Sequence, residues 1–188
     1  MEALLVSVTT IAIAEVGDRT QLLSLILAAR YGRPWPILAG ILLATLANHA
    51  AAGLVGVWFG RLLAPRVLDL IVGASLILMA AWTLKPDKLD QAELTALRSS
   101  GVFLTTLIAF FIAEIGDKTQ IATVALAAAY SNLAAVVAGT TCGMLLANAP
   151  VVFLGKAFAH RLPLRSIRIG AATLFAVLGV LFVLRGRR

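Results

Sequence analysis

Apolar runs of about 20 residues recur along the whole chain of 188 residues, and each run is long enough to cross a hydrocarbon core of about 30 Å. The chain is 61% hydrophobic and only 13% charged, whereas about a quarter of the residues in an average soluble domain are charged. The runs are too long and continuous for the strands of a membrane barrel, which alternate apolar and polar residues over about 10 positions. The sequence therefore predicts an all-α polytopic protein in a lipid bilayer, without a sizeable soluble domain.

Six transmembrane helices account for the apolar runs, and Gly, Pro and Arg residues separate most of them. A longer polar connection, 85–100, lies between the third run and the fourth. The expected spans are 4–29, 36–59, 67–84, 101–129, 133–156 and 167–184.

The 16 Lys and Arg residues give the chain a net charge of +7, which in a soluble protein would suggest a nucleic-acid partner. Here most of them lie in the connections between spans, as in other membrane proteins, so no nucleic-acid partner is expected. Nine lie on the side of the 85–100 connection and five on the opposite side. Because basic loops tend to stay in the cytoplasm, this distribution favours a cytoplasmic central connection with both termini outside.

A short motif occurs twice: EVGDRTQ begins at Glu15, and EIGDKTQ begins at Glu114, 99 residues later. The chain is therefore expected to consist of two three-helix repeats, 1–84 and 101–188, joined by the 85–100 loop and packed as one membrane domain. Because each repeat has an odd number of spans, the second is inverted relative to the first, an arrangement common in secondary transporters. The similarity continues at nearly the same offset in the pairs Ser24 and Thr123, Tyr31 and Tyr130, Gly40 and Gly139, and Asn48 and Asn148.

Both motifs place charged residues near the middle of an expected span. Glu15 and Asp18 have about ten mostly apolar residues on either side, which at a rise of about 1.5 Å per residue places them near the bilayer midplane. A charge there costs at least about 2.5–3.5 kcal/mol, so intramembrane acids usually have a function. The structural alternative is that each acid pairs with a base. Adjacent residues such as Asp18 and Arg19 point about 100° apart on a helix, which disfavours pairing within one motif but leaves pairing between the repeats open.

The spacing of the polar residues directs several oxygen atoms towards one site. Carboxylates three residues apart lie about one helical turn apart, so both reach the same cavity. Gly17 and Gly116 offer each helix a place to unwind, which keeps the following side chains converging. Oxygen ligands without thiolates favour a divalent cation such as Ca²⁺, Mn²⁺ or Mg²⁺. The expected metal ligands are Glu15, Asp18, Gln21, Glu114, Asp117 and Gln120, with Arg19, Lys118, Ser24, Thr123, Asn48 and Asn148 in supporting positions.

The charges of the two motifs suggest an exchange of ions. Four acids and two bases leave two net negative charges, which one divalent cation or two protons would neutralise. This balance predicts metal/proton antiport without a permanently bound cofactor. Asn48 and Asn148 fit either metal ligands or hydrogen bonds between helices. His49 has Ala149 as its counterpart in the second repeat and is expected to pack between helices, with a metal ligand or proton relay as the alternative.

The duplicated motif resembles the E-x-G-D-[KR]-[TS] signature of the transmembrane-protein-165 family, whose members exchange manganese or calcium for protons. The resemblance covers essentially the whole chain. It implies that Glu15, Asp18, Glu114 and Asp117 bind the transported cation. It also implies that a bacterial member of this size exports surplus Mn²⁺ across the inner membrane, with Ca²⁺ as the next expected substrate.

Two other functions compete with this prediction. An exporter of small amines or basic amino acids would also use paired acids, and an absence of metal binding would favour it. An intramembrane aspartyl protease is disfavoured because Glu15 stands where the G-x-G-D motif needs Gly, and because no Tyr-Asp pair occurs in the chain. The protein is therefore expected not to be an enzyme, and a homo-oligomer is left open.

Overall fold

The computed structural model describes residues 1–85, 101–154 and 164–186, and every regular element in these ranges is an α-helix. The expected all-helical class is thereby confirmed. Of the expected polar connection 85–100, residues 86–100 lie outside the described ranges. The helices are α1 (Glu2–Glu15), α2 (Arg19–Tyr31), α3 (Pro34–Leu62), α4 (Pro65–Thr83), α6 (Val102–Glu114), α7 (Lys118–Ala129), α8 (Leu133–Leu154) and α10 (Leu164–Arg185).

Four helices are long and apolar enough to cross a membrane: α3, α4, α8 and the stretch Ile169–Gly186, most of which belongs to α10. They correspond to four of the six expected spans. The other two, 4–29 and 101–129, are each divided into a pair of shorter helices, α1 with α2 and α6 with α7. A membrane crossing by each of these pairs, and hence the total of six, stays a prediction.

Both divisions fall at the repeated motif. The backbone leaves the helix at Val16 and at Ile115, and Gly17 and Gly116 follow with φ angles of 82° and 73°. Glycine takes this left-handed conformation without the steric cost that a Cβ atom imposes. The next helices begin directly afterwards, at Arg19 and at Lys118. The motif glycines therefore unwind both helices, as their position in the sequence suggested.

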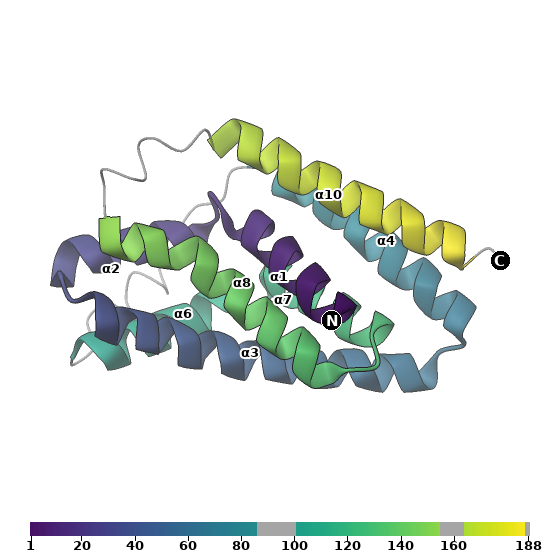
Figure 1. Ribbon diagram of the computed structural model, residues 1–188, viewed down its shortest axis with the longest axis horizontal. Coiled ribbons are helices and arrows are strands. Elements are labelled where there is room, and N and C mark those ends of the chain that lie inside the picture. The colour runs from purple at the N-terminus through teal and green to yellow at the C-terminus, as the bar shows by residue number, and fades with distance from the viewer. Residues whose placement is uncertain (86–100, 155–163, 187–188) are drawn as a thin grey trace.

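The first helix of each broken pair packs against the long helix of the other half of the chain (Figure 1). On α8, a Cβ atom added to Gly139 or Gly143 would come within 2.7 Å of a carbonyl oxygen of α1. On α3, a Cβ atom added to Gly40 would come within 2.7 Å of Thr106 Cβ on α6. Small residues thus let these helix backbones approach closely, as in other membrane bundles.

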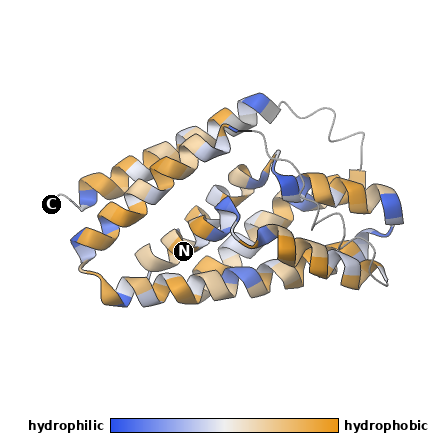
Figure 2. Cartoon of the chain, turned by 180° about the vertical axis from the view of Figure 1, so that it is seen from behind, coloured by the Kyte–Doolittle hydropathy of each residue, from blue (hydrophilic) through white to orange (hydrophobic). Residues whose placement is uncertain are grey.

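Helices α4 and α10 lie side by side along one edge of the molecule, where α10 packs against α1 and α4 packs against α7 (Figure 1). They cross at Gly73 and Gly179, where a Cβ atom on either residue would come within 2.7 Å of the other's carbonyl oxygen. Figure 2 shows that hydrophobic residues make up most of the long helices. Many of them are exposed, including Trp35 at 73% and Leu78 at 72%, as expected of a surface that faces lipid.

Candidate metal centre

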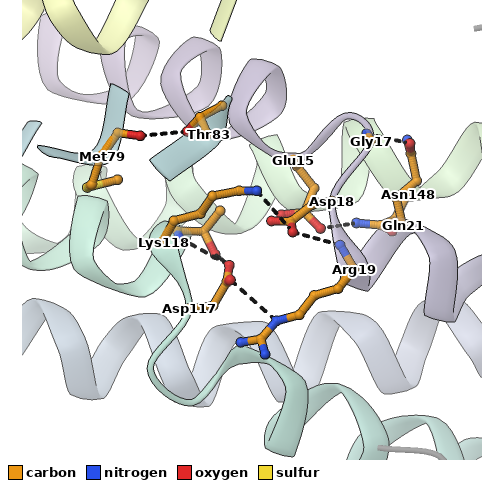
Figure 3. A network of polar contacts seen from close by, with 11 residues as sticks. Glu15, Gly17, Asp18, Arg19, Gln21, Met79, Thr83, Asp117, Lys118 and Asn148 are labelled. Carbon is orange, nitrogen blue, oxygen red and sulfur yellow. Dashed lines mark hydrogen bonds and ion pairs between the residues drawn. The ribbon is translucent and has the colours of Figure 1, made fainter. Parts of the chain in front are cut away.

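The two helix breaks meet inside the molecule, and their acids form one cluster (Figure 3). Glu15 ends α1, Asp18 precedes α2 and Asp117 precedes α7. One carboxylate oxygen of each lies within 4.8 Å of the other two, and all three residues are buried. Carboxylate oxygens at such distances can share one divalent cation. The fold therefore brings together three of the six expected ligands, drawn from both copies of the motif.

Each aspartate of the cluster forms an ion pair with the base of the other motif (Figure 3). Lys118 Nζ lies 3.0 Å from Asp18 Oδ1, and the two side chains are 4% and 0% exposed. Arg19 Nε lies 3.4 Å from Asp117 Oδ1, and the Arg19 side chain is 16% exposed. Pairing between the repeats, which the sequence left open, is therefore present. It ties the two halves of the chain together at the acid cluster.

The same aspartates cap the helices that follow the breaks. Asp18 Oδ1 accepts a hydrogen bond of 2.6 Å from the Arg19 N–H. Asp117 Oδ2 accepts the Thr119 N–H at 3.2 Å and the Thr119 hydroxyl at 2.9 Å. A carboxylate at a helix N-terminus also interacts favourably with the positive end of the helix dipole. These hydrogen bonds fix the direction of both carboxylates.

The two motif glutamines close the helix breaks. Gln21 Oε1 accepts the Gly17 N–H, and Gln120 Oε1 accepts the Gly116 N–H, both at 2.8 Å. Gln21 Nε2 in addition donates to the Ala147 carbonyl at 3.1 Å. Both amide oxygens, which the sequence suggested as metal ligands, are therefore engaged with the backbone in this structure. The spacing D-x-x-Q, typical of a helix capping box, is the sequence signal for this role.

Glu15 is held by a chain of hydrogen bonds from α8 and α2. Asn148 Nδ2 donates to Glu15 Oε1 at 3.2 Å, and the Ser24 hydroxyl donates to Asn148 Oδ1 at 2.6 Å. Asn148 thus forms the hydrogen bond between helices that was one of its two expected roles. The second oxygen, Glu15 Oε2, is buried and has no hydrogen-bond partner among the described residues.

Glu114 has different surroundings from Glu15. The Thr45 hydroxyl on α3 donates to Glu114 Oε1, and Glu114 does not belong to the group of acids that could share one ion among the described residues. Asn48, the counterpart of Asn148, donates to the Phe111 carbonyl at 3.2 Å. Sequence reasoning missed Thr45, because a single threonine in an apolar span has no signal of its own.

Two further residues singled out in the sequence lie in the interior. The Thr123 hydroxyl donates to the Thr119 carbonyl of its own helix at 2.8 Å, so it contributes no bond to the acids. His49 is completely buried on α3, and neither ring nitrogen has a hydrogen-bond partner among the described residues. Its packing role stays a prediction.

The chemistry of the cluster suits a hard cation. Its donors are carboxylate oxygens, the ligands that Ca²⁺, Mg²⁺ and Mn²⁺ prefer. Glu15 Oε2 is a buried acceptor that a cation or a proton would satisfy. The three clustered acids and the two bases leave one net negative charge, and Glu114 adds a second. The four acids and two bases of the two motifs taken together can therefore be neutralised by one divalent cation or by two protons.

Known proteins match nearly the whole chain. The family model described as "Divalent cation/proton antiporter GDT1" matches residues 3–91 and 102–188. A "Putative manganese exporter" of Vibrio cholerae is 52% identical over 181 residues, which are 96% of this chain and 90% of that protein. A GDT1-like protein of Synechocystis is 29% identical over 193 residues, covering 90% of this chain and 91% of that protein. The "Divalent cation/proton antiporter GDT1" of Saccharomyces cerevisiae is 29% identical over 91 residues, covering 48% and 32%. No solved structure matches.

These matches confirm the family resemblance that the duplicated motif indicated. The two matched ranges each contain one copy of the motif. The family consists of transporters rather than enzymes, in agreement with the expectation from the sequence. The chain belongs to the GDT1 family of divalent cation/proton antiporters.

Proposed function

We propose that this protein exports Mn²⁺ in exchange for protons, and that Glu15, Asp18 and Asp117 bind the transported ion. The observation that carries the proposal is the buried convergence of these three carboxylates, which come from both copies of the motif. The name of the Vibrio cholerae relative favours Mn²⁺ over Ca²⁺ as the substrate.

The proposed exchange follows from the charge of the site. A divalent cation leaving the cluster would uncover buried negative charge, which is unfavourable in a medium of low dielectric constant. Protons taken up by the carboxylates would restore neutrality, and Glu15 Oε2 is a buried oxygen able to receive one. Metal and protons would therefore occupy the site in turn. This alternation is the basis of antiport.

The proposed transport path uses two inverted three-helix repeats, 1–84 and 101–188, with the site near the bilayer midplane between them. Three features support this arrangement. Both motif helices break at the same motif position, and α1 packs on α8 as α6 packs on α3. Tyr130, at the end of α7, donates to Glu2, at the start of α1, over 3.4 Å, so the two helices lie on the same side of the site and run antiparallel. Broken helices that meet at the midplane are a recurring design for ion sites in secondary transporters.

The proposed location is the inner membrane of a bacterium, with the 85–100 connection in the cytoplasm and both termini outside. The bias of nine basic residues against five supports this orientation. Cysteines placed near each terminus would test this orientation in an accessibility assay. Labelling of these cysteines from the cytoplasmic side would contradict it.

The test is a flux assay in proteoliposomes that records Mn²⁺ and protons together, with Ca²⁺ and Mg²⁺ in parallel. Asp18→Asn and Asp117→Asn should each lower Mn²⁺ flux by at least about tenfold, as expected for loss of a metal ligand. Asp69→Asn is the matched control, because Asp69 pairs with Arg185 at 3.7 Å outside the cluster and should leave the flux unchanged.

Three outcomes would contradict parts of the proposal. Wild-type Mn²⁺ flux without opposing proton movement would exclude antiport. Full activity of both aspartate variants would exclude the proposed site. Absence of binding to Mn²⁺, Ca²⁺ and Mg²⁺ by the purified protein would favour the amine exporter instead.

A further inference from the structure

The ammonium group of Lys118 already occupies part of the proposed ion site. Its Nζ lies 3.0 Å from Asp18 Oδ1, and Asp18 is one of the three clustered carboxylates. The Lys118 and Asp18 side chains are 4% and 0% exposed. A buried ammonium needs a close acidic partner, since its desolvation is otherwise costly.

The backbone of α7 carries Lys118 into this position. Asp117 is the N-cap of α7 and Lys118 is the first residue of the helix, so the second motif delivers an acid and a cation to the same place (Figure 3). A divalent ion shared by Glu15, Asp18 and Asp117 would lie beside the ammonium. Like charges repel strongly at this distance in a medium of low dielectric constant. The metal and the Lys118 ammonium therefore compete for Asp18.

The equivalent base of the first motif is placed differently. Arg19 Nε lies 3.4 Å from Asp117 Oδ1, and the Arg19 side chain is 16% exposed. Contact with solvent screens it more than the buried Lys118 is screened. Competition with the metal is therefore stronger at Lys118 than at Arg19.

We propose that Lys118 is a tethered counter-cation of the ion site, holding Asp18 in the metal-free protein and being displaced when a divalent cation binds. The ammonium stays charged throughout, and only its position changes. Its return to Asp18 would lower the affinity for the metal and so promote release. This inference rests on the proposed function, because it assigns to Lys118 a role in releasing the ion that the acids bind.

The test compares Mn²⁺ binding and transport in Lys118→Met with those of the wild type. Methionine keeps an unbranched side chain without the charge. Isothermal titration calorimetry on the purified full chain, at pH 8 where protons compete least for carboxylates, should show a Kd for Mn²⁺ about tenfold lower. In proteoliposomes, KM for Mn²⁺ should fall and kcat should fall with it, because release becomes slower. A merely structural role would lower kcat without tightening the binding of Mn²⁺.

Two control variants make the comparison specific. Lys118→Arg keeps the charge and should keep the Kd near that of the wild type, whereas Arg19→Met should change the Kd by less than Lys118→Met does. Should Lys118→Met unfold without metal, the Mn²⁺ concentration that restores its thermal transition gives the affinity instead. Lys118→Gln provides a second neutral side chain for the same measurement.

The outcomes separate this inference from the proposed function. A wild-type protein that binds no divalent cation overturns both. A wild type that binds Mn²⁺, together with a Lys118→Met variant that binds it equally or more weakly, overturns the role of Lys118 alone. Tighter binding in Lys118→Met combined with unchanged binding in Lys118→Arg supports it.

Discussion

The left-handed backbone at Gly116 allows a test of whether the helix breaks are needed for transport. Gly116 has a φ angle of 73°, and a Cβ atom added there would meet no atom of the described residues within 4 Å. Gly116→Ala therefore adds backbone strain without a clash. The substitution therefore perturbs the backbone conformation at the break and leaves the packing contacts unchanged.

The size of the effect on stability follows from two opposing contributions. A residue with a Cβ atom in the left-handed conformation costs about 1–2 kcal/mol. Alanine also restricts the unfolded chain, which raises the free energy of unfolding by about 0.4–1 kcal/mol. The net loss is about 1 kcal/mol, or about 2–4 °C in Tm for a chain of this length.

The effect on transport should exceed the effect on stability. The chain can relieve the strain by turning φ negative, which moves the Gly116 N–H away from Gln120 Oε1, now 2.8 Å distant. Asp117 follows directly in sequence and would turn with it. Because small displacements of site residues can cost large factors in rate, Mn²⁺ flux should fall by about tenfold or more.

Gly32 provides the matched control for this substitution. It also has a positive φ angle, 58°, and no described atom within 4 Å of an added Cβ, but it caps the far end of α2. Gly32→Ala should lower Tm by a similar amount and leave the flux unchanged. Gly116→Asn should retain more stability and flux than Gly116→Ala, since asparagine tolerates the left-handed region.

Flux and thermal unfolding measured on the same preparations decide the question. Equal flux in Gly116→Ala and Gly32→Ala would refute the reasoning, because the break would then be dispensable for transport. An unchanged Tm in both variants would refute the assigned strain.

Two hydrogen bonds to the buried glutamates give further predictions. Asn148→Leu removes the donor to Glu15 Oε1 and should reduce Mn²⁺ flux by about tenfold. Asn48→Leu removes a donor to the Phe111 carbonyl, outside the acid cluster, and should reduce it less; the reverse order would contradict this role of Asn148. Thr45→Val removes the hydroxyl that donates to Glu114 and should lower the free energy of unfolding by about 1–3 kcal/mol. Thr140→Val is its control, since that hydroxyl only donates within its own helix; equal losses in denaturant titrations would exclude a special bond at Thr45.

Much of the site could be predicted because the motif carries local information. Glycine in the middle of an apolar span indicates a place where a helix can unwind. Aspartate directly after it, with glutamine three residues further on, indicates the start of a new helix. The sequence marks Gly17 and Gly116 as places where the helices can break, and the structure shows that they do; the capping by Asp18 is equally local.

The remaining features depend on the placement of distant segments. The ion pair between Asp18 and Lys118 joins residues 100 positions apart. The helical angle disfavours the adjacent base as a partner of Asp18, but no property of either motif alone selects Lys118. The single amide oxygen of Gln21 could bind a metal or accept the Gly17 N–H, and in the structure it accepts the Gly17 N–H. Thr45 becomes a partner of Glu114 only because α3 packs against α6, the helix that ends at Glu114.

The two motifs are almost identical in sequence, yet their glutamates have unequal surroundings. Glu15 belongs to the acid cluster and accepts a hydrogen bond from Asn148 on α8, whereas Glu114 accepts one from Thr45 on α3. In the proposed transport cycle, an exchange of conformations between the halves would bring Glu114 to the cluster and withdraw Glu15. The two end states then differ in their hydrogen bonds and so in free energy, and the residues that set this bias lie outside the duplicated motif.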